Sequence, residues 1–102
     1  MKVYLAGKIS GLKNYRKKFL KAERILKRKG HSIFNPALIN AYPEFTWEDY
    51  ISVTKAMLKR CDAILLLPDW KDSKGANLEY EYAKKLGLSV FFSIKDIPKC
   101  KK

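Results

Sequence analysis

The chain has 102 residues and a formal net charge of +12, from 22 Lys and Arg against 10 Asp and Glu. This length suffices for one domain, which we place at residues 1–94, followed by a basic tail at residues 95–102. No apolar run is long enough for a membrane span or a signal peptide, so we expect a soluble, cytoplasmic protein. Its 2 cysteines, Cys61 and Cys100, form neither a disulfide framework nor a metal-ligand pair.

The positive charge would attract anions, and it raises the question of nucleic-acid binding. Lys outnumbers Arg 18 to 4, whereas contacts that read bases or fork onto phosphates are typical of Arg. We therefore expect a generally anion-attracting surface, and specific nucleic-acid contact is the less favoured alternative.

Predicted strands and helices alternate along the chain. Short segments rich in strand-forming residues predict strands over residues 2–6, 32–34, 63–67 and 89–93. Apolar residues at helical spacing predict helices over residues 15–29, 47–60 and 76–86. Asn14 is the expected cap of the first helix, Thr46 and Asp49 are an expected capping box for the second, and Gly87 closes the third.

The order β-α-β-α-β-α-β predicts an α/β fold with a parallel sheet, of small Rossmann-like type with the flavodoxin-like strand order 2-1-3-4. In such sheets, ligands bind beyond the carboxyl ends of the strands, where the strand order reverses. The loops over residues 7–14 and 68–75 both follow strands at that point and carry Gly and polar residues. We expect these loops to be neighbours that bind a ligand.

Glu79 is the most informative residue. On a helical wheel it falls near the middle of the apolar arc of the third helix, whose other members are Ala76, Leu78, Tyr82, Ala83 and Leu86. A carboxylate facing the core is costly unless it is paired or has a task. Two interpretations stay open at this point: a catalytic carboxylate with a tuned pKa, or a buried Glu that accepts hydrogen bonds from loop amides.

Both loops contain segments that could hold an anion. Ser73-Lys74-Gly75 leads into the third helix, where free amides beside a glycine make an anion site, although an ordinary Ser cap is the simpler interpretation. Gly7-Lys8-Ile9-Ser10-Gly11 follows the first strand, but it matches neither the dinucleotide-binding fingerprint nor the P-loop. On its own, this second segment is a weak sign of a phosphate loop.

Several aromatic residues have two interpretations. Tyr4, on the first strand, is either a core tyrosine or a phenol that orients Glu79. Trp70, in the second loop, either stacks on a base or covers the core. We expect Trp47 and Tyr50 to pack the second helix against the core.

Five segments, taken in order, match a known family. They are residues 4–11 (YLAGKISG), 35–37 (NPA), 47–50 (WEDY), 61–63 (CDA) and 70–79 (WKDSKGANLE). This set, which spans about residues 1–93, closely resembles a family of short phage and bacterial proteins without an assigned function. That family is related to the nucleoside 2-deoxyribosyltransferases and the deoxynucleoside 5′-monophosphate N-glycosidases.

The resemblance implies cleavage of the N-glycosidic bond of 2-deoxynucleosides or their monophosphates, with no metal or organic cofactor. Glu79 matches the nucleophile of the S-x-G-x-x-x-E pattern, and Tyr4 matches the tyrosine that orients it. The positions that match the 5′-phosphate site of the monophosphate hydrolases are Gly7, Lys8, Ser10, Gly11 and Ser73, with Ile9 and Gly75 in the same two segments. The resemblance also implies a homodimer or a larger oligomer.

Thr54 departs from the family pattern. Relatives carry an Asp, which assists departure of the base, about eight residues before the Asp that matches Asp62; here that position is Thr54. Threonine cannot act as a general acid near neutral pH, and such assistance is worth about 10² to 10⁴ in rate. Three hypotheses stay open: an enzyme with Glu79 as nucleophile, which we favour, a catalytically reduced nucleotide-binding module, and a nucleic-acid binder that uses the basic first helix.

Overall fold

The computed structural model describes residues 1–9, 13–41 and 43–100. Within these ranges the strands form one parallel sheet in the order β2-β1-β3-β4, which confirms the predicted fold class. The strands and helices are β1 Lys2–Ala6, α1 Tyr15–Arg28, β2 Ser32–Phe34, α2 Trp47–Leu58, β3 Ala63–Leu66, α3 Lys74–Leu86 and β4 Ser89–Phe91. None of the helices found there has the length and apolar character that a membrane crossing requires.

Three short 3₁₀ helices form in segments for which no helix was predicted. They are η1 Pro36–Ala41, η2 Trp70–Asp72 and η3 Ile94–Asp96. α3 begins at Lys74 and not at Ala76 because Ser73 caps it, its Oγ accepting a hydrogen bond of 3.1 Å from the Ala76 amide. β3 and β4 also end earlier than predicted, at Leu66 and Phe91.

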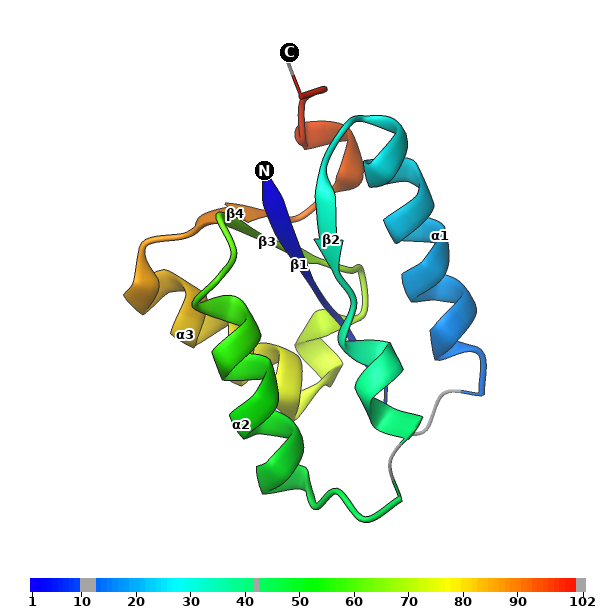
Figure 1. Cartoon of the computed structure of the whole chain (residues 1–102), viewed down its shortest axis with the longest axis vertical. Helices are drawn as coiled ribbons and strands as arrows, with labels where there is room; N and C mark the ends of the chain where they lie inside the picture. The colour runs from blue at the N-terminus through cyan, green and yellow to red at the C-terminus, as the bar shows by residue number, and fades with distance from the viewer. Residues whose placement is uncertain (10–12, 42, 101–102) are drawn as a thin grey trace.

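The sheet separates two layers of helices, with α1 on one face and α2 and α3 on the other (Figure 1). Val3 and Leu5 of β1 pack in the buried cluster that contains Phe19 of α1. Tyr4 and Ala6 point to the opposite face, because side chains alternate along a strand, and they pack in the cluster beneath α2 and α3. The centre of the sheet therefore directs Tyr4 toward α2 and α3.

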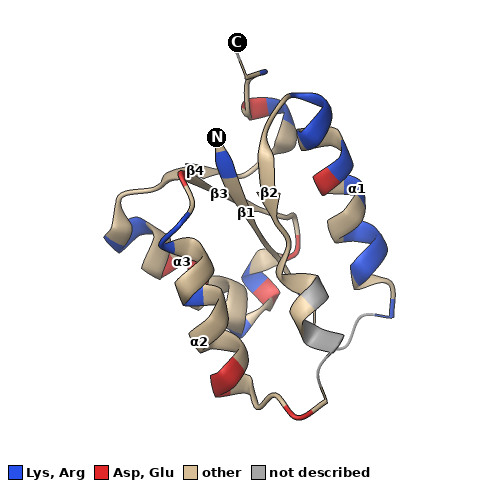
Figure 2. Ribbon diagram, in the orientation of Figure 1, with Lys and Arg blue, Asp and Glu red and all other residues tan. Residues whose placement is uncertain are grey.

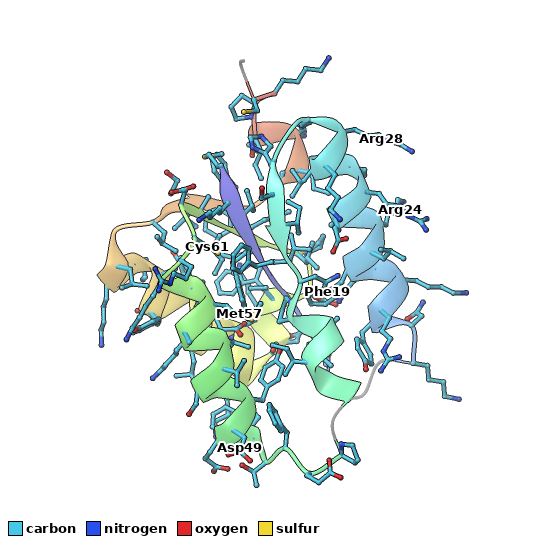
Figure 3. The ribbon with its side chains drawn as sticks, in the orientation of Figure 1. Phe19, Arg24, Arg28, Asp49, Met57 and Cys61 are labelled. Atoms are coloured by element: carbon cyan, nitrogen blue, oxygen red, sulfur yellow. The ribbon has the colours of Figure 1, made fainter. Side chains whose placement is uncertain are left out.

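The outer face of α1 carries a band of basic residues (Figure 2). Phe19 points toward the sheet, whereas Arg24 and Arg28 point into solvent (Figure 3). Of the arginines in the sequence, those on α1 are Arg16, Arg24 and Arg28. This basic face lies across the sheet from Glu79, so the charge on α1 is separate from the environment of that carboxylate.

Local capping interactions define the helix ends. Thr46 and Asp49 form the predicted capping box: Thr46 Oγ1 accepts from the Asp49 amide at 3.1 Å, and Asp49 Oδ2 accepts from the Thr46 amide at 3.0 Å. α3 ends at Gly87, whose φ of 78° lies in the left-handed region that favours glycine. Asn14 occupies the predicted cap position before α1, but its ψ of 27° is not extended and its side chain makes no capping hydrogen bond.

The segment after β4 packs back onto the sheet. Ile97 is fully buried in the cluster on the α1 side. Lys29 Nζ donates to the carbonyls of Ile94 (2.9 Å) and Ile97 (2.6 Å), and the Lys29 carbonyl accepts from the Cys100 amide at 2.7 Å. The N-terminus and the last described residue, Cys100, therefore lie at the end of the molecule opposite the carboxyl ends of the strands (Figure 1).

Candidate active site

A pocket of about 480 Å³ opens at the carboxyl end of the sheet. It is lined by the residues that follow β1 and by the first turns of α2 and α3. The residues of the predicted site that line it are Gly7, Lys8, Ile9, Ser73, Gly75 and Glu79. Ser10 and Gly11 lie outside the described residues. The structure therefore brings the two predicted loops to one cavity. In the described part of the chain, no group of three or more His, Cys, Asp and Glu side chains is arranged to hold a metal ion.

Asp69 joins the two loops. Its Oδ1 accepts a hydrogen bond of 3.0 Å from the Lys8 amide, and its Oδ2 forms an ion pair with Lys18 of α1. Burial raises the pKa of Asp69, but the Lys18 ammonium and the Lys8 amide outweigh burial and hold this pKa below its ordinary value. Gly7 belongs to the same junction, because a Cβ there would lie 3.0 Å from Leu67 Cδ1 and 3.3 Å from Asp69 Oδ1.

Glu79 lines the pocket from α3, although its side chain is only 3% exposed. The hydroxyl of Tyr4, which is fully buried, donates a hydrogen bond of 2.5 Å to Glu79 Oε2. Desolvation raises the pKa of Glu79 to about 7, and the hydrogen bond from Tyr4 partly opposes this shift. A phenol from β1 therefore fixes one oxygen of a carboxyl group that titrates near neutral pH.

Tyr50 and Thr54, both on α2, lie beside this pair. Tyr50 was expected to pack the helix but lines the pocket, and burial followed by the charge of Glu79 raises its pKa. The same two causes raise the pKa of Tyr4, so both phenols are protonated at neutral pH. Thr54 is fully buried, and its Oγ1 donates to the Ile51 carbonyl at 3.1 Å.

The two tryptophans lie in different environments, one on the core and one at the pocket. Trp70 lies away from the pocket, with its ring centroid 5.0 Å from Tyr80 and 6.0 Å from Phe92, and it covers the core. Of the two interpretations of Trp70, the structure therefore supports the one in which the ring covers the core, because η2 turns it toward these two aromatic residues. Trp47, which was expected to pack α2, is 41% exposed and lines the pocket.

The start of α3 forms the remaining wall, with Ser73, Lys74 and Gly75. Asn77 attaches this start to the preceding turn, because its Nδ2 donates to the Ser73 carbonyl at 2.8 Å and to two carbonyls of η2 at 3.1 and 3.3 Å. The first amides of a helix and the positive end of its dipole stabilise an anion. The Lys74 side chain adds a positive charge at the same wall.

The fold has relatives among solved structures. The CMP N-glycosidase BcmB of Clostridium botulinum aligns with a TM-score of 0.62 at 20% sequence identity, over 88% of this chain and 66% of that chain. The 2-deoxyribosyltransferase of Bacillus psychrosaccharolyticus aligns with a TM-score of 0.67 at 29% identity, over 88% of this chain and 69% of that chain. This chain is thus a nucleoside 2-deoxyribosyltransferase-like domain, as the resemblance predicts, and it spans about two thirds of each relative.

The sequence itself assigns the chain to a family. The family model described as a domain of unknown function, DUF4406, matches residues 1–92, and the chain belongs to this family. No curated protein sequence matches the chain.

Proposed function

We propose that the protein cleaves the N-glycosidic bond of a nucleoside or nucleotide, with Glu79 as the nucleophile. The observation that carries this proposal is a carboxylate only 3% exposed that nevertheless lines the pocket and is held by Tyr4 at 2.5 Å. The similarity to an N-glycosidase and a 2-deoxyribosyltransferase supports the same reaction class.

The reaction proceeds in two displacements. An oxygen of ionised Glu79 forms a bond to C1′ as the C1′–N bond breaks, and the base leaves with the electron pair and takes up a proton from solvent. Water, or a second base, then attacks C1′ as the C1′–O bond to Glu79 breaks; the attacking group loses a proton to solvent and the Glu79 carboxylate is released. Tyr4 holds Oε2, so the second carboxylate oxygen is available for the attack.

Electropositive groups favour a substrate with an anionic end. Lys8, Lys74 and the start of α3 line the pocket. Their charge favours an anionic group of the substrate at this part of the pocket. The 5′-phosphate of a deoxynucleoside monophosphate fits this part, in agreement with the resemblance.

Thr54 supports a second candidate function, a nucleotide-binding module with little turnover. The Thr54 hydroxyl donates to a backbone carbonyl of its own helix, and it cannot give a proton to a departing base near neutral pH. In this candidate function the pocket binds the same ligands, and the protein sequesters or senses them.

A measurement of base release distinguishes the two candidate functions. We expect the wild-type protein to release free base from at least one member of a panel of deoxynucleosides and their 5′-monophosphates, measured by chromatography. Glu79→Ala should release none, while Glu81→Ala, a change on the exposed face of the same helix, should behave as wild type. Saturable binding of a nucleotide with equal, negligible base release from all three proteins would establish the binding module instead.

A further inference from the structure

The outer face of α1 carries more positive charge than its contacts within the protein neutralise. Seven of the 14 residues of this helix are Lys or Arg, and one is acidic. Three of the seven have partners within the protein: Lys18 with Asp69, Lys27 with Glu23, and Arg16 with Tyr15. The other four, which form no ion pair within the part of the chain that the structure describes, are Lys17, Lys21, Arg24 and Arg28.

These four side chains, the basic row, lie along one line of the helix. They follow one another at intervals of four, three and four residues, so at about 100° per residue they fall within an arc of about 60°. They are all exposed, and they line one groove together with Leu20 and Ile25. At a rise of about 1.5 Å per residue the row extends over about 16 Å, along the basic band that Figure 2 shows on α1. A row of this length fits an extended anion better than a single anionic group.

No carboxylate of the described residues pairs with the basic row. Glu23 is the acidic residue of α1, but its side chain is only 16% exposed, and it contacts Lys27 Nζ at 3.0 Å and Asn35 Nδ2 at 3.2 Å. Within the row, two pairs of cations stand four residues apart, and like charges at this spacing destabilise a helix. The row therefore costs stability in the isolated protein, and an anionic partner relieves the repulsion.

We propose that the basic row binds the phosphate backbone of a nucleic-acid duplex without reading its sequence. A duplex presents a continuous run of charge, with one phosphate per about 3.4 Å of axis in each strand, so several phosphates can face a row of about 16 Å. Lys and Arg at the phosphates provide the affinity of such contacts and need no contact to a base. The row lies across the sheet from the pocket that contains Glu79, so this function is separate from the chemistry of the pocket.

The surroundings of the row favour a duplex over other anionic partners. The apolar face of α1, with Phe19 and Leu26, is buried against the sheet and cannot enter a membrane. Single-stranded nucleic acid is bound by stacking on exposed aromatic side chains, and aromatic or apolar anchors hold most protein interfaces. In the described part of the chain, the exposed large aromatic side chains are those of Phe45, Trp47 and Phe92. None of them is on α1, where Leu20 is the single exposed large apolar residue.

Fluorescence anisotropy with labelled DNA and RNA duplexes of unrelated sequence tests the proposal. Four phosphate contacts predict a slope of about −3.6 for the logarithm of the association constant against the logarithm of salt concentration, so affinity should fall by about 100-fold between 50 and 200 mM NaCl. Changing all four residues of the row to Gln keeps a similar helix propensity. This variant should bind more weakly than wild type by more than about 10-fold at 50 mM NaCl, with a slope close to zero.

A control with the same loss of charge separates the row from the net charge of the protein. Four exposed cations in the layer of α2 and α3 serve for this purpose: Lys59, Arg60, Lys84 and Lys85. Changing these four to Gln should weaken duplex binding far less than the changes in the row, because salt screens charges that do not contact the phosphates. Glu79→Ala should bind the duplex as wild type does, and circular dichroism checks the fold of each variant.

Several results would overturn the proposal. One is no binding of the wild-type protein to either the DNA or the RNA duplexes, and another is an equal loss of affinity in the two sets of Gln variants. Equal affinity for polyglutamate and for the duplex would assign the row to an acidic protein partner instead. Displacement of the duplex by a deoxynucleoside monophosphate would mean that the duplex binds at the pocket and not at the row.

Discussion

Tyr4 Oη and Glu79 Oε2 lie 2.5 Å apart, although 75 positions separate the two residues in the chain. β1 supplies the phenol from the centre of the sheet, and α3 supplies the carboxylate from the layer above it. This hydrogen bond opposes the effect of burial on Glu79, because it stabilises the charged form of the carboxylate.

Tyr4→Phe should therefore reduce activity and shift its pH dependence. Losing a buried hydrogen bond to a charged group costs about 1.5–3 kcal/mol, so we expect base release to slow by about 10- to 100-fold. Glu79 must be ionised to attack, so wild-type activity should rise with pH through about 7. In Tyr4→Phe this rise should move to higher pH, which a pH series of kcat/KM measures. An unshifted profile would show that Tyr4 has no influence on Glu79.

The buried carboxyl also makes stability depend on pH. The pKa of Glu79 rises from 4.5 to about 7 on folding, so the folded state binds the proton more tightly than the unfolded state. Its contribution to stability is complete below pH 4.5 and is lost as the pH rises through about 7. We expect the free energy of unfolding to carry a Glu79 contribution that falls by up to about 1.4 kcal/mol per pH unit in this window.

Glu79→Gln removes that contribution. In urea unfolding at pH 5 and pH 8, the variant should gain stability relative to wild type at the higher pH. A difference between the two proteins that is the same at both pH values would mean that Glu79 is not titrating in this range.

Gly75→Ala should separate folding from ligand binding. A Cβ at this position would lie 3.7 Å from Ile51 Cδ1 and 3.9 Å from Ser73 Oγ, which are ordinary contacts. Alanine in the first turn of α3 should therefore stabilise the protein by up to about 1 kcal/mol. Gly75 lines the pocket, so a methyl group at this position should also lower nucleotide affinity. Thermal unfolding and calorimetry measure the two effects, and Gly87→Ala, at a φ of 78°, should instead destabilise.

Thr54→Asp should restore a proton donor for the departing base. If the missing acid limits the reaction, base release should increase by about 10² to 10⁴. The new carboxyl is buried beside Glu79, so we also expect lower stability and a higher pKa for Glu79. Thr54→Val is the matched control, and it should not increase activity. No gain in Thr54→Asp, with the fold intact by circular dichroism, would show that the base leaves without help from this position.

The sequence pattern predicts the sheet and the burial of Glu79 for one physical reason. Strand and helix periodicities report which side chains are buried, and burial is what makes Glu79 and Thr54 unusual. Periodicity left two interpretations of Tyr4 open, and its pairing with Glu79 came from the family resemblance; the structure shows the hydrogen bond between the two side chains.

Positions at the ends of elements could not be predicted in this way. Trp47 occupies an inward position on the wheel, but at the first turn of α2 the helix extends past the core, so the side chain meets the pocket instead. The orientation of the Trp70 ring depends on the backbone of η2. Asn77 fixes that backbone by donating hydrogen bonds to two of its carbonyls, an interaction that apolar periodicity does not report. The packing of Ile97 against the α1 side of the sheet could not be predicted either, because the segment that contains it has no regular apolar pattern.

The account depends most on a covalent bond between Glu79 and C1′, and mass spectrometry of the acid-quenched reaction detects that bond. We predict that protein mixed with a cleaved deoxynucleoside monophosphate gains the mass of one 2-deoxyribosyl 5-phosphate group. Peptide mapping should place the group on Glu79, and Glu79→Gln should gain no mass. Base release by the wild-type protein with the adduct on another residue, or undiminished base release by Glu79→Gln, would contradict the account.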